Sequence, residues 1–388
     1  MNVPQLRFSG FDGEWEQQEL GELLEFKNGI NADKDSYGYG TKFINVLDIL
    51  NNDYILSDKI IGSVNASQKQ LETYSVTYGD ILFLRSSETR EDVGICNVYL
   101  DEETPAVFGG FVIRGKKIAD YSPFFLKAVL NNSSARNQIS SKAGGSTRYN
   151  VGQSILSEVN VRVPEIKEQQ KISSFFMLLN QKTEKQQEKI KKLEQFKKGM
   201  MQKIFSQELR FKDEDGGEFS EWEEKKLGDL CNITTGKLDA NAMQSDGQYR
   251  FYTCAKEYYW IDKYAFDTEA LLVSGNGANV GYIHYYKGKF NAYQRTYVLD
   301  AFEENIIYLK FYLERFLSLR IMAEKNVGNT PYIVLGTLYD MPILIPDIRE
   351  QAKIATFLSE LDTKLKLEKD KLLVLEEQKR GIMQGMFV

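Results

Sequence analysis

The residues best suited to covalent or metal chemistry are few in this chain. Its 388 residues include one histidine, His284, and three cysteines, Cys96, Cys231 and Cys254. His284 lies in a strand-like run rich in tyrosine, without the partners that a metal ligand or a general base needs. The cysteines have no C-x-x-C or other metal spacing, and their odd number argues against a disulfide framework. We therefore predict no catalytic residue and no metal site.

Motifs that indicate nucleotide or methyl-transfer chemistry are also missing. The sequence has no Gly-x-x-x-x-Gly-Lys-Ser/Thr loop, and no Asn/Asp-Pro-Pro-Tyr/Phe segment of the kind that amino-methyltransferases use. A Ser-His-Asp set cannot be assembled sensibly from one histidine. The glycine-rich stretch from Ser274 to Asn279 opens no helix, so it is a weak candidate for a phosphate cradle. We predict no cofactor, and expect any chemistry to belong to partner chains.

The composition is that of an ordinary globular protein with room for two or three domains. Hydrophobic residues make up 42% and charged residues 27% of the chain, and no apolar run is long enough to cross a membrane. The first residues, Met1 to Arg7, lack the basic and apolar regions of a secretion signal. We expect a cytoplasmic protein with no membrane partner.

The net charge of −6 is unusual for a protein that binds a polyanion, because such affinity comes largely from lysine and arginine. The charges are unevenly distributed, however. Acidic residues gather at Glu14 to Glu22 and Asp213 to Glu224, whereas Lys182 to Lys203 contains eight lysines and three glutamates. The total charge therefore neither supports nor excludes DNA binding.

The chain contains two copies of one framework. Glu14-Trp15-Glu16 returns as Glu221-Trp222-Glu223, 207 positions later, and the segment from Pro164 to Gln169 returns as Pro346 to Gln351, 182 positions later. Between these blocks the copies differ by 25 residues in length and hardly match. A repeated scaffold with divergent inserts suits recognition of two unlike halves of one ligand, because each insert can change without disturbing its mounting. Trp15 and Trp222 should therefore be framework residues.

The inserts have the pattern of mixed α/β globules. In the first, strand-like runs such as Asp80 to Leu84 and Phe111 to Ile113 are separated by Gly, Asn and Ser turns, and one amphipathic helix is expected from about Ser122 to Ser134 or slightly beyond. The second has a helix near Ile307 to Lys325. The exposed or buried state of Tyr258-Tyr259-Trp260 is open; packing in a core or sheet is favoured over base stacking.

Two long helices are predicted, at about 165–205 and 347–387. Apolar residues recur in the first with a coiled-coil period, with Phe176, Thr183, Ile190, Lys197 and Ile204 at one heptad position. Each helix would be roughly 60 Å long at 1.5 Å per residue. Since neither can bury its apolar stripe alone, the two should pack on each other.

The junction between the copies predicts a contact between the ends of the chain. Glu208 to Phe211, which follows the first long helix, resembles the opening segment Gln5 to Phe8. The second long helix ends at Phe387, the counterpart of Phe205. If a pseudo-twofold axis relates the halves, the opening segment should lie against the end of the last helix.

The chain has a divergent globule, then the segment Pro164 to Gln169 leading into a long helix, then the Trp222 block that opens the second copy. This order resembles the specificity subunit of type I restriction-modification systems. The resemblance covers essentially the whole chain and implies an α+β fold, in which two mixed α/β target-recognition globules are separated by two long antiparallel coiled-coil helices with a pseudo-twofold internal repeat. The expected domains are 1–163 and 207–345 for recognition, and 164–206 and 346–388 for the spacer helices. The resemblance implies a bipartite double-stranded DNA target, two methyltransferase subunits and restriction/translocase subunits as partners. The alternatives are an enzyme with a disguised active site and a structural coiled-coil adaptor.

Candidate DNA contacts are polar side chains on loops and strand ends, because these match base edges and phosphates. In the first globule Arg85 follows a strand-like run, and Gly144-Gly145 precedes a second polar cluster. A solvated turn is the alternative for the Arg85 cluster. Thr147 and Tyr149 match Thr330 and Tyr332, so these four could instead serve a turn and core common to both copies. The candidates in this globule are Lys27, Asn28, Arg85, Ser86, Ser87, Arg90, Lys142, Ser146, Thr147 and Arg148.

In the second globule the segment from Ser274 to Asn279 follows a strand and takes the place of the Arg85 loop. A tight glycine turn explains it as well as amide side chains that recognise adenine. Arg295, which leads into the strand at Tyr297, is the strongest single candidate for a base or phosphate contact. The candidates here are Thr235, Lys237, Ser274, Asn276, Asn279, Arg295, Asn329 and Thr330.

Overall fold

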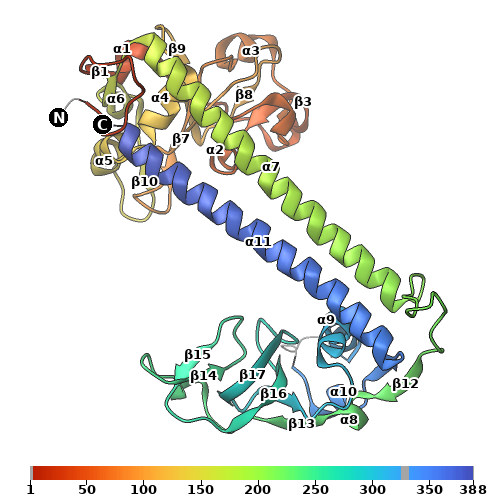
Figure 1. Ribbon diagram of the computed structural model, residues 1–388. Helices are drawn as coiled ribbons and strands as arrows, with labels where there is room; N and C mark the ends of the chain where they lie inside the picture. The colour runs from red at the N-terminus through yellow and green to blue at the C-terminus, as the bar shows by residue number, and fades with distance from the viewer. Residues whose placement is uncertain (1–2, 325–331, 388) are drawn as a thin grey trace. The chain divides into compact units, whose positions relative to one another are not determined.

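The computed structural model describes residues 3–324 and 332–387. By its internal contacts the chain divides into two compact units, Met1–Gln187 with Lys371–Val388, and Glu188–Asp370. The elements of each unit are shown in Figure 1. Within the described ranges, no helix combines the length and the apolar composition that a membrane span requires.

The first unit contains a four-stranded antiparallel sheet with the order β2-β9-β5-β7 and a smaller sheet with the order β4-β3-β8. Two-stranded pairs join β1 to β11 and β6 to β10. The elements are β1 (Glu16–Glu19), α1 (Leu20–Leu23), β2 (Leu24–Asn28), β3 (Tyr37–Ile44), α2 (Val46–Leu50), β4 (Ser63–Val64), α3 (Gln68–Tyr74), β5 (Ile81–Leu84), β6 (Ser86–Ser87), β7 (Cys96–Val98), β8 (Val107–Phe108), β9 (Val112–Lys117), α4 (Pro123–Leu130), α5 (Ser133–Lys142), β10 (Tyr149–Asn150), α6 (Gln153–Ser157) and β11 (Asn160–Val163).

The core explains why the run at β5 is apolar throughout. Ile81 and Phe83 pack in the cluster that contains Phe125, whereas Leu82 packs on the opposite face with Phe108. A strand that is buried on both faces shows no alternation of polar and apolar residues. The strand therefore holds the loop that follows it on a rigid base.

The second unit contains one six-stranded sheet with the order β13-β18-β16-β17-β14-β15. Its elements are β12 (Glu223–Lys226), α8 (Leu227–Leu230), β13 (Asn232–Thr235), β14 (Tyr249–Tyr252), β15 (Tyr259–Ile261), β16 (Phe266–Ser274), β17 (Ile283–Ala292), β18 (Thr296–Asp300), α9 (Ile306–Glu324), α10 (Leu335–Tyr339) and β19 (Pro342–Ile345). Leu271 and Val273 of β16 pack against α9, and Leu272 packs on the other face of the sheet. The predicted helix near Ile307 is confirmed.

The two long helices are α7 (Ile166–Phe205) and α11 (Ile348–Met386), which confirms both predictions to within two residues. In the second unit Lys189 pairs with Glu368 at 2.9 Å, and Glu194 pairs with Lys369 at 2.6 Å. Lys197 pairs with Asp362, so the residue numbers run in opposite directions and the helix segments are antiparallel. In the first unit Phe176 of α7 stacks on Phe387, which follows α11, with centroids 5.8 Å apart.

The heptad assignment is confirmed along α7. Phe176, Thr183, Ile190 and Ile204 are buried, and Lys197 is half-buried, where it pairs with Asp362. Polar residues at this position restrict the register in which two helices can pack. The α+β fold expected from the sequence is confirmed.

The ends of the chain meet as predicted. The Leu6 backbone N–H donates to the Gly385 carbonyl at 2.7 Å, and within the chain the Leu209 N–H donates to the Lys203 carbonyl at 3.0 Å. Lys203 and Gly385 occupy equivalent positions of the repeated framework. Equivalent hydrogen bonds therefore join the two ends of the chain, at Leu6 and Gly385, and two nearby residues in the middle of the chain, Leu209 and Lys203.

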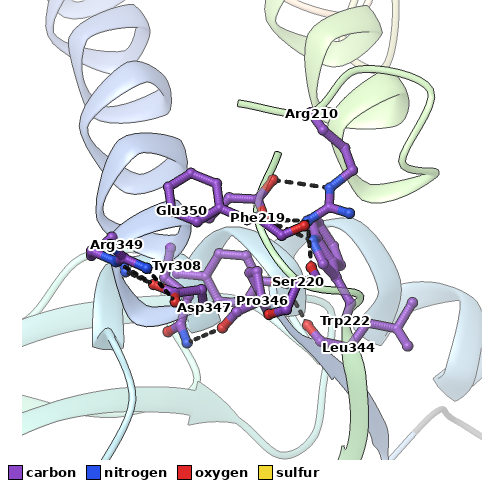
Figure 2. Close-up of polar contacts among 11 residues, drawn as sticks. Arg210, Phe219, Ser220, Trp222, Tyr308, Leu344, Pro346, Asp347, Arg349 and Glu350 are labelled. Atoms are coloured by element: carbon purple, nitrogen blue, oxygen red, sulfur yellow. Dashed lines mark hydrogen bonds and ion pairs between the residues drawn. The ribbon is translucent and has the colours of Figure 1, made fainter. Parts of the chain in front are cut away.

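An ion pair repeats at both junctions. Arg7 donates to both carboxylate oxygens of Glu168, at 2.8 and 2.7 Å, and Arg210 does the same to Glu350 at 3.2 and 2.7 Å. Figure 2 shows the second pair, where the Trp222 Nε1–H also donates to Glu350, at 3.0 Å. Both carboxylates are buried, and so are Trp15 and Trp222, as expected for framework residues. These pairs fix the segments that lead into each globule.

One helix prediction is wrong. The helix expected from about Ser122 to Ser134 is two helices, because α4 ends at Leu130 and α5 begins at Ser133. Asn131 uses its side chain to bond the backbone of Cys96, donating to its carbonyl at 2.8 Å and accepting from its N–H at 3.2 Å. Asn132 accepts from the Ser133 N–H and so caps α5. Two consecutive asparagines thus end one helix and start the next.

Candidate nucleic-acid interface

Strand pairing brings the predicted residues of the first globule to one end of its main sheet. Asn28 at the end of β2 lies opposite Ile113 near the start of β9, and Leu84 at the end of β5 lies opposite Val112. Arg85 follows directly, and its N–H donates to the Phe111 carbonyl at 2.9 Å. Asn28 and the Arg85 loop therefore share one edge.

The second predicted cluster joins the same edge through a short ribbon. Ser87 and Ser86 of β6 pair with Tyr149 and Asn150 of β10, and the Ser86 hydroxyl donates to the Asn150 side-chain oxygen. The Arg90 guanidinium lies over the Tyr149 ring, 4.9 Å from its centroid. We call the group of Asn28, Arg85, Ser86, Ser87, Arg90, Ser146, Thr147 and Arg148 the first polar edge.

A tight loop holds the tip of this edge. Gly144 and Asn150 exchange two backbone hydrogen bonds, of 3.1 and 2.8 Å, which close the loop between them. Gly145 has φ +123°, and a Cβ there would lie 1.9 Å from the Arg148 carbonyl oxygen, so only glycine fits. Ser146, Thr147 and Arg148 are exposed at the loop tip. Their donors therefore face solvent from a fixed backbone.

Several side chains of the first polar edge also have structural partners. Arg85 is half-buried and donates through Nη1 to the Gly110 carbonyl at 3.1 Å. Its carbonyl accepts from the Val151 N–H at 3.0 Å, which ties the ribbon to the sheet. Arg85 thus positions the edge as well as contributing charge to it.

The second globule has an edge with the same backbone pattern. Thr235 ends β13 opposite Tyr297, and the Gly275 N–H donates to the Arg295 carbonyl at 2.8 Å. Asn276 forms a bridge with Tyr332, as Ser87 does with Tyr149 in the first globule. The Ile333 N–H donates to the Gly275 carbonyl at 2.8 Å, the counterpart of the Val151 bond to Arg85.

We call Thr235, Lys237, Asn276, Asn279 and Arg295 the second polar edge. Lys237 and Arg295 are exposed, and Asn276 is half-buried. The Asn279 side-chain amide donates to the Cys254 carbonyl at 3.1 Å, which anchors the loop from Gly275 to Asn279. The predicted equivalence of this loop with the Arg85 loop is confirmed by the shared backbone bonds.

Other predicted residues are buried, have structural partners or lie outside the described part of the chain. Lys27 is within β2 with its ammonium 5.5 Å from the Tyr74 ring centroid, and Lys142 forms an ion pair with Glu158 at 2.9 Å. Ser274 has a relative exposure of 0%, so we leave it out of the second polar edge. Asn329 and Thr330 lie outside the described residues.

Sequence reasoning missed Phe111. The apolar pattern predicts Phe111 as part of a strand-like run, but β9 begins at Val112 and the Phe111 side chain is 61% exposed at the first polar edge. The preceding pair Gly109-Gly110 was the available signal, because paired glycines favour a turn over a strand. Tyr258-Tyr259-Trp260 lie in and beside β15, which agrees with the favoured packing in a sheet, although their side chains are 36–41% exposed.

The histidine and cysteines have structural surroundings. His284 Nε2 lies 3.0 Å from the Ala255 carbonyl, between the rings of Tyr252 and Tyr282. Burial lowers the pKa of His284 and outweighs the effect of that carbonyl, so the imidazole stays neutral near pH 7. Burial also raises the pKa of the Cys96 and Cys231 thiols to about 12, which leaves them protonated and unreactive.

Comparison with known families gives a match over most of the chain. Residues 12–195 and 219–377 match the family model of the type I restriction modification DNA specificity domain. The specificity subunit of the type I restriction enzyme EcoDI from Escherichia coli is 42% identical over 154 residues, covering 38% of this chain and 34% of that subunit. The MjaIX specificity subunit from Methanocaldococcus jannaschii is 22% identical over an alignment of 409 residues, covering 95% of this chain and 92% of that one.

The match therefore spans about a third of the EcoDI subunit, and a match to the putative MjaX specificity subunit from Methanocaldococcus jannaschii spans about half of that protein. Among solved structures, the S subunit of a type I restriction-modification system from M. genitalium is similar, with a TM-score of 0.66 and 16% identity, covering 100% of this chain and 99% of that one. A chain from a structural study of complex assembly in the type I R-M system has a TM-score of 0.57 and 15% identity, covering 95% and 96%. These likenesses establish the fold.

Proposed function

This chain belongs to the family of type I restriction-modification DNA specificity subunits. We propose that it is itself non-catalytic and that its two globules each recognise one half of a split DNA target. The observation that carries the proposal is a contrast. The framework repeats its side-chain contacts, whereas the two polar edges repeat their backbone bonds but expose different side chains. One ligand with two unlike halves requires this combination. A ligand with identical halves would require identical edges.

The polar edges supply the chemistry that DNA recognition requires. Arginine and lysine neutralise phosphates, and arginine can also donate two hydrogen bonds to guanine. Asparagine, serine and threonine match the donors and acceptors of base edges. Both edges lie at the ends of paired strands, which hold side chains more precisely than long loops do.

The domain organisation and the partners are part of the proposal. Recognition domains at 1–163 and 207–345 would be joined by spacer helices at 164–206 and 346–388. The relatives are named as subunits of type I restriction enzymes, and this supports two methyltransferase subunits and restriction/translocase subunits as partners of the chain. The target is double-stranded DNA in the cytoplasm, where these partners would act.

The decisive experiment exchanges one insert. Residues 20–159, which lie between the paired strands β1 and β11, are replaced by the equivalent segment of another specificity subunit, and methylated positions are then sequenced in cells that carry the whole system. We expect one half of the methylated target to change while the other half and its distance stay the same. A change in both halves, or in neither, would contradict recognition by separate globules.

A second experiment tests the edge itself. Arg295→Ala removes an exposed guanidinium and should weaken binding of the full complex to its target by about 1–3 kcal/mol, without loss of folded protein. Affinity is measured over a series of salt concentrations, because a lost phosphate contact also lowers the salt dependence. Unchanged affinity at every salt concentration would remove Arg295 from the interface.

A further inference from the structure

One position is built identically in both globules but carries side chains of opposite character. Residues 109–112 form a turn closed by the Val112 N–H to the Gly109 carbonyl at 2.9 Å, and residues 293–296 form the same turn, closed by the Thr296 N–H to the Tyr293 carbonyl at 2.8 Å. Phe111 and Arg295 occupy the third position of their turns. Each turn leads directly into a strand, β9 or β18.

The neighbouring loop fixes this position in the same way in both globules. The Phe111 carbonyl accepts from the Arg85 N–H at 2.9 Å, and the Arg295 carbonyl accepts from the Gly275 N–H at 2.8 Å. Since the turn bond and this bond hold the backbone on both sides, the side chain projects from a fixed point. Both side chains are exposed, Phe111 by 61%.

Phe111 is unusual for its surroundings. Single exposed apolar residues are common on protein surfaces and alone indicate nothing. Phe111, however, stands next to Arg85, whose guanidinium bonds the Gly110 carbonyl, at the edge that carries Ser86 and Ser87. An aromatic ring held rigidly among hydrogen-bond donors would lose most of its contact with water only when a ligand covers it.

We infer that Phe111 and Arg295 are equivalent specificity-determining residues, and that Phe111 contacts a thymine methyl group in one half-site while Arg295 contacts guanine in the other. The inference rests on the proposed function. In the major groove the thymine C5 methyl is the apolar feature of a base edge, and phenylalanine is one of the side chains that contact it. Guanine presents two acceptors, O6 and N7, that match the two donors of a guanidinium.

The test uses single-atom changes in DNA. The full chain in complex with its partner subunits selects its target from a randomised duplex library, and the selected duplex is remade with uracil in place of each thymine, which removes only the methyl group. At one thymine of the half-site bound by the first globule, uracil should weaken binding about fourfold, the value for one buried methyl group. Phe111→Ala should bind the thymine and uracil duplexes equally.

Two matched variants separate contact from folding. Phe111→Leu keeps an apolar side chain and should keep the preference for thymine. Ile118→Ala removes an apolar side chain that is 54% exposed and lies just beyond the other end of β9. The six residues of this strand separate Ile118 from Phe111 by about 20 Å. Ile118→Ala should bind like the unaltered chain and still distinguish thymine from uracil.

The second half-site provides the complementary arm. Replacing guanine by 7-deazaguanine removes the N7 acceptor, and at one guanine this should weaken binding about tenfold for the unaltered complex and not at all for Arg295→Ala. Phe111→Arg should in turn select guanine in the first half-site. A gain of guanine there would be the strongest support for the equivalence.

The outcomes are distinct. If the unaltered complex selects no sequence from the library, the proposed function fails. If it selects a split target but shows no uracil effect in the first half-site, or if Phe111→Ala keeps that effect, the inference is overturned while the proposed function stands. The inference is also overturned if Phe111→Ala lowers the affinity for the thymine duplex and for the uracil duplex by the same factor. That result would indicate a ring inserted between base steps, which does not depend on the thymine methyl group.

Discussion

The junctions and the polar edges differ in what the two halves of the chain have in common. At the junctions the halves agree in side chains, since Arg7 with Glu168 matches Arg210 with Glu350. Phe8 and Phe175 meet edge to face at 5.6 Å, as Phe211 and Phe357 do at 5.8 Å. At the polar edges the backbone bonds agree, but the side chains differ at equivalent positions such as Ser87 and Asn276. The framework thus meets one structural requirement twice, whereas the two polar edges present different side chains on one backbone pattern.

The largest expected effect breaks the framework side of this comparison. Glu350 is buried and accepts hydrogen bonds from Arg210 and from Trp222, whereas Glu168 has Arg7 as its partner and the Trp15 indole N–H has none within the described residues. Removing one member of a buried pair costs about 3–5 kcal/mol. Glu350→Ala should therefore lower the free energy of unfolding by about this amount. Glu168→Ala should cost about 1 kcal/mol less, the value of one hydrogen bond.

Chemical denaturation followed by tryptophan fluorescence measures both, because each unit contains tryptophan. Glu350→Gln is the matched control, since it keeps an acceptor for Trp222 while losing the charge. Equal losses for Glu350→Ala and Glu168→Ala would mean that the two junctions do not differ in the way the Trp222 bond indicates.

The second prediction concerns the backbone that the polar edges share. A Cβ at Gly29 would lie 2.1 Å from the Gly109 carbonyl oxygen, and a Cβ at the equivalent Gly236 would lie 1.8 Å from the Ala292 carbonyl oxygen. Since each backbone would have to shift, Gly29→Ala and Gly236→Ala should each destabilise the chain by about 1–3 kcal/mol. Each should also weaken recognition of one half-site, measured by binding to duplexes altered in one half.

Gly199→Ala is the control for this pair. Gly199 lies within α7, and a Cβ there would meet nothing within 4 Å, so alanine should stabilise the helix by about 0.5–1 kcal/mol. If Gly29→Ala and Gly236→Ala were as harmless as Gly199→Ala, the edges would not depend on the close approach of their strands.

The sequence predicts the framework far better than the edges, for physical reasons. The long helices follow from a periodic apolar pattern over many turns, so their ends are predicted to within two residues. The contact of Leu6 with Gly385 follows from the repeat itself. Strand order does not follow, because pairing such as that of β2 with β9 joins residues far apart in the sequence and depends on the whole core.

The polar edges are also harder to predict from the sequence, because the residue type does not determine in which direction a side chain points from a turn. Ser274 is of a residue type that often contacts DNA, but it ends β16 inside the core, where its hydroxyl has no partner among the described residues. Phe111 is of a residue type that is usually buried, but it projects from a turn. Both assignments needed the register of the strands on either side.

A third prediction uses a thiol that only the second edge has nearby. Cys254 is half-buried and its Sγ lies 3.4 Å from the Arg295 carbonyl, whereas burial raises the pKa of Cys96 and Cys231 to about 12. An alkylating reagent at neutral pH should therefore modify Cys254 first in the folded chain. Mass spectrometry of digested protein identifies the site. Target DNA should slow this reaction, and an unchanged rate in the presence of target DNA would argue against DNA near Arg295.

The smallest expected effect is a pH dependence confined to the second globule. Burial lowers the pKa of His284, so the unfolded chain binds a proton at a higher pH than the folded chain does. Stability from this group is therefore complete above the ordinary histidine pKa of about 6.5 and is lost as the pH falls below it. The difference in unfolding free energy between pH 7.5 and pH 5.5 should be smaller in His284→Gln than in the unaltered chain. Since the first globule has no histidine, the denaturation step reported by Trp15 should be the same in His284→Gln and in the unaltered chain. If the second globule had the same pH dependence in both proteins, the pKa of His284 would not differ between the folded and the unfolded chain.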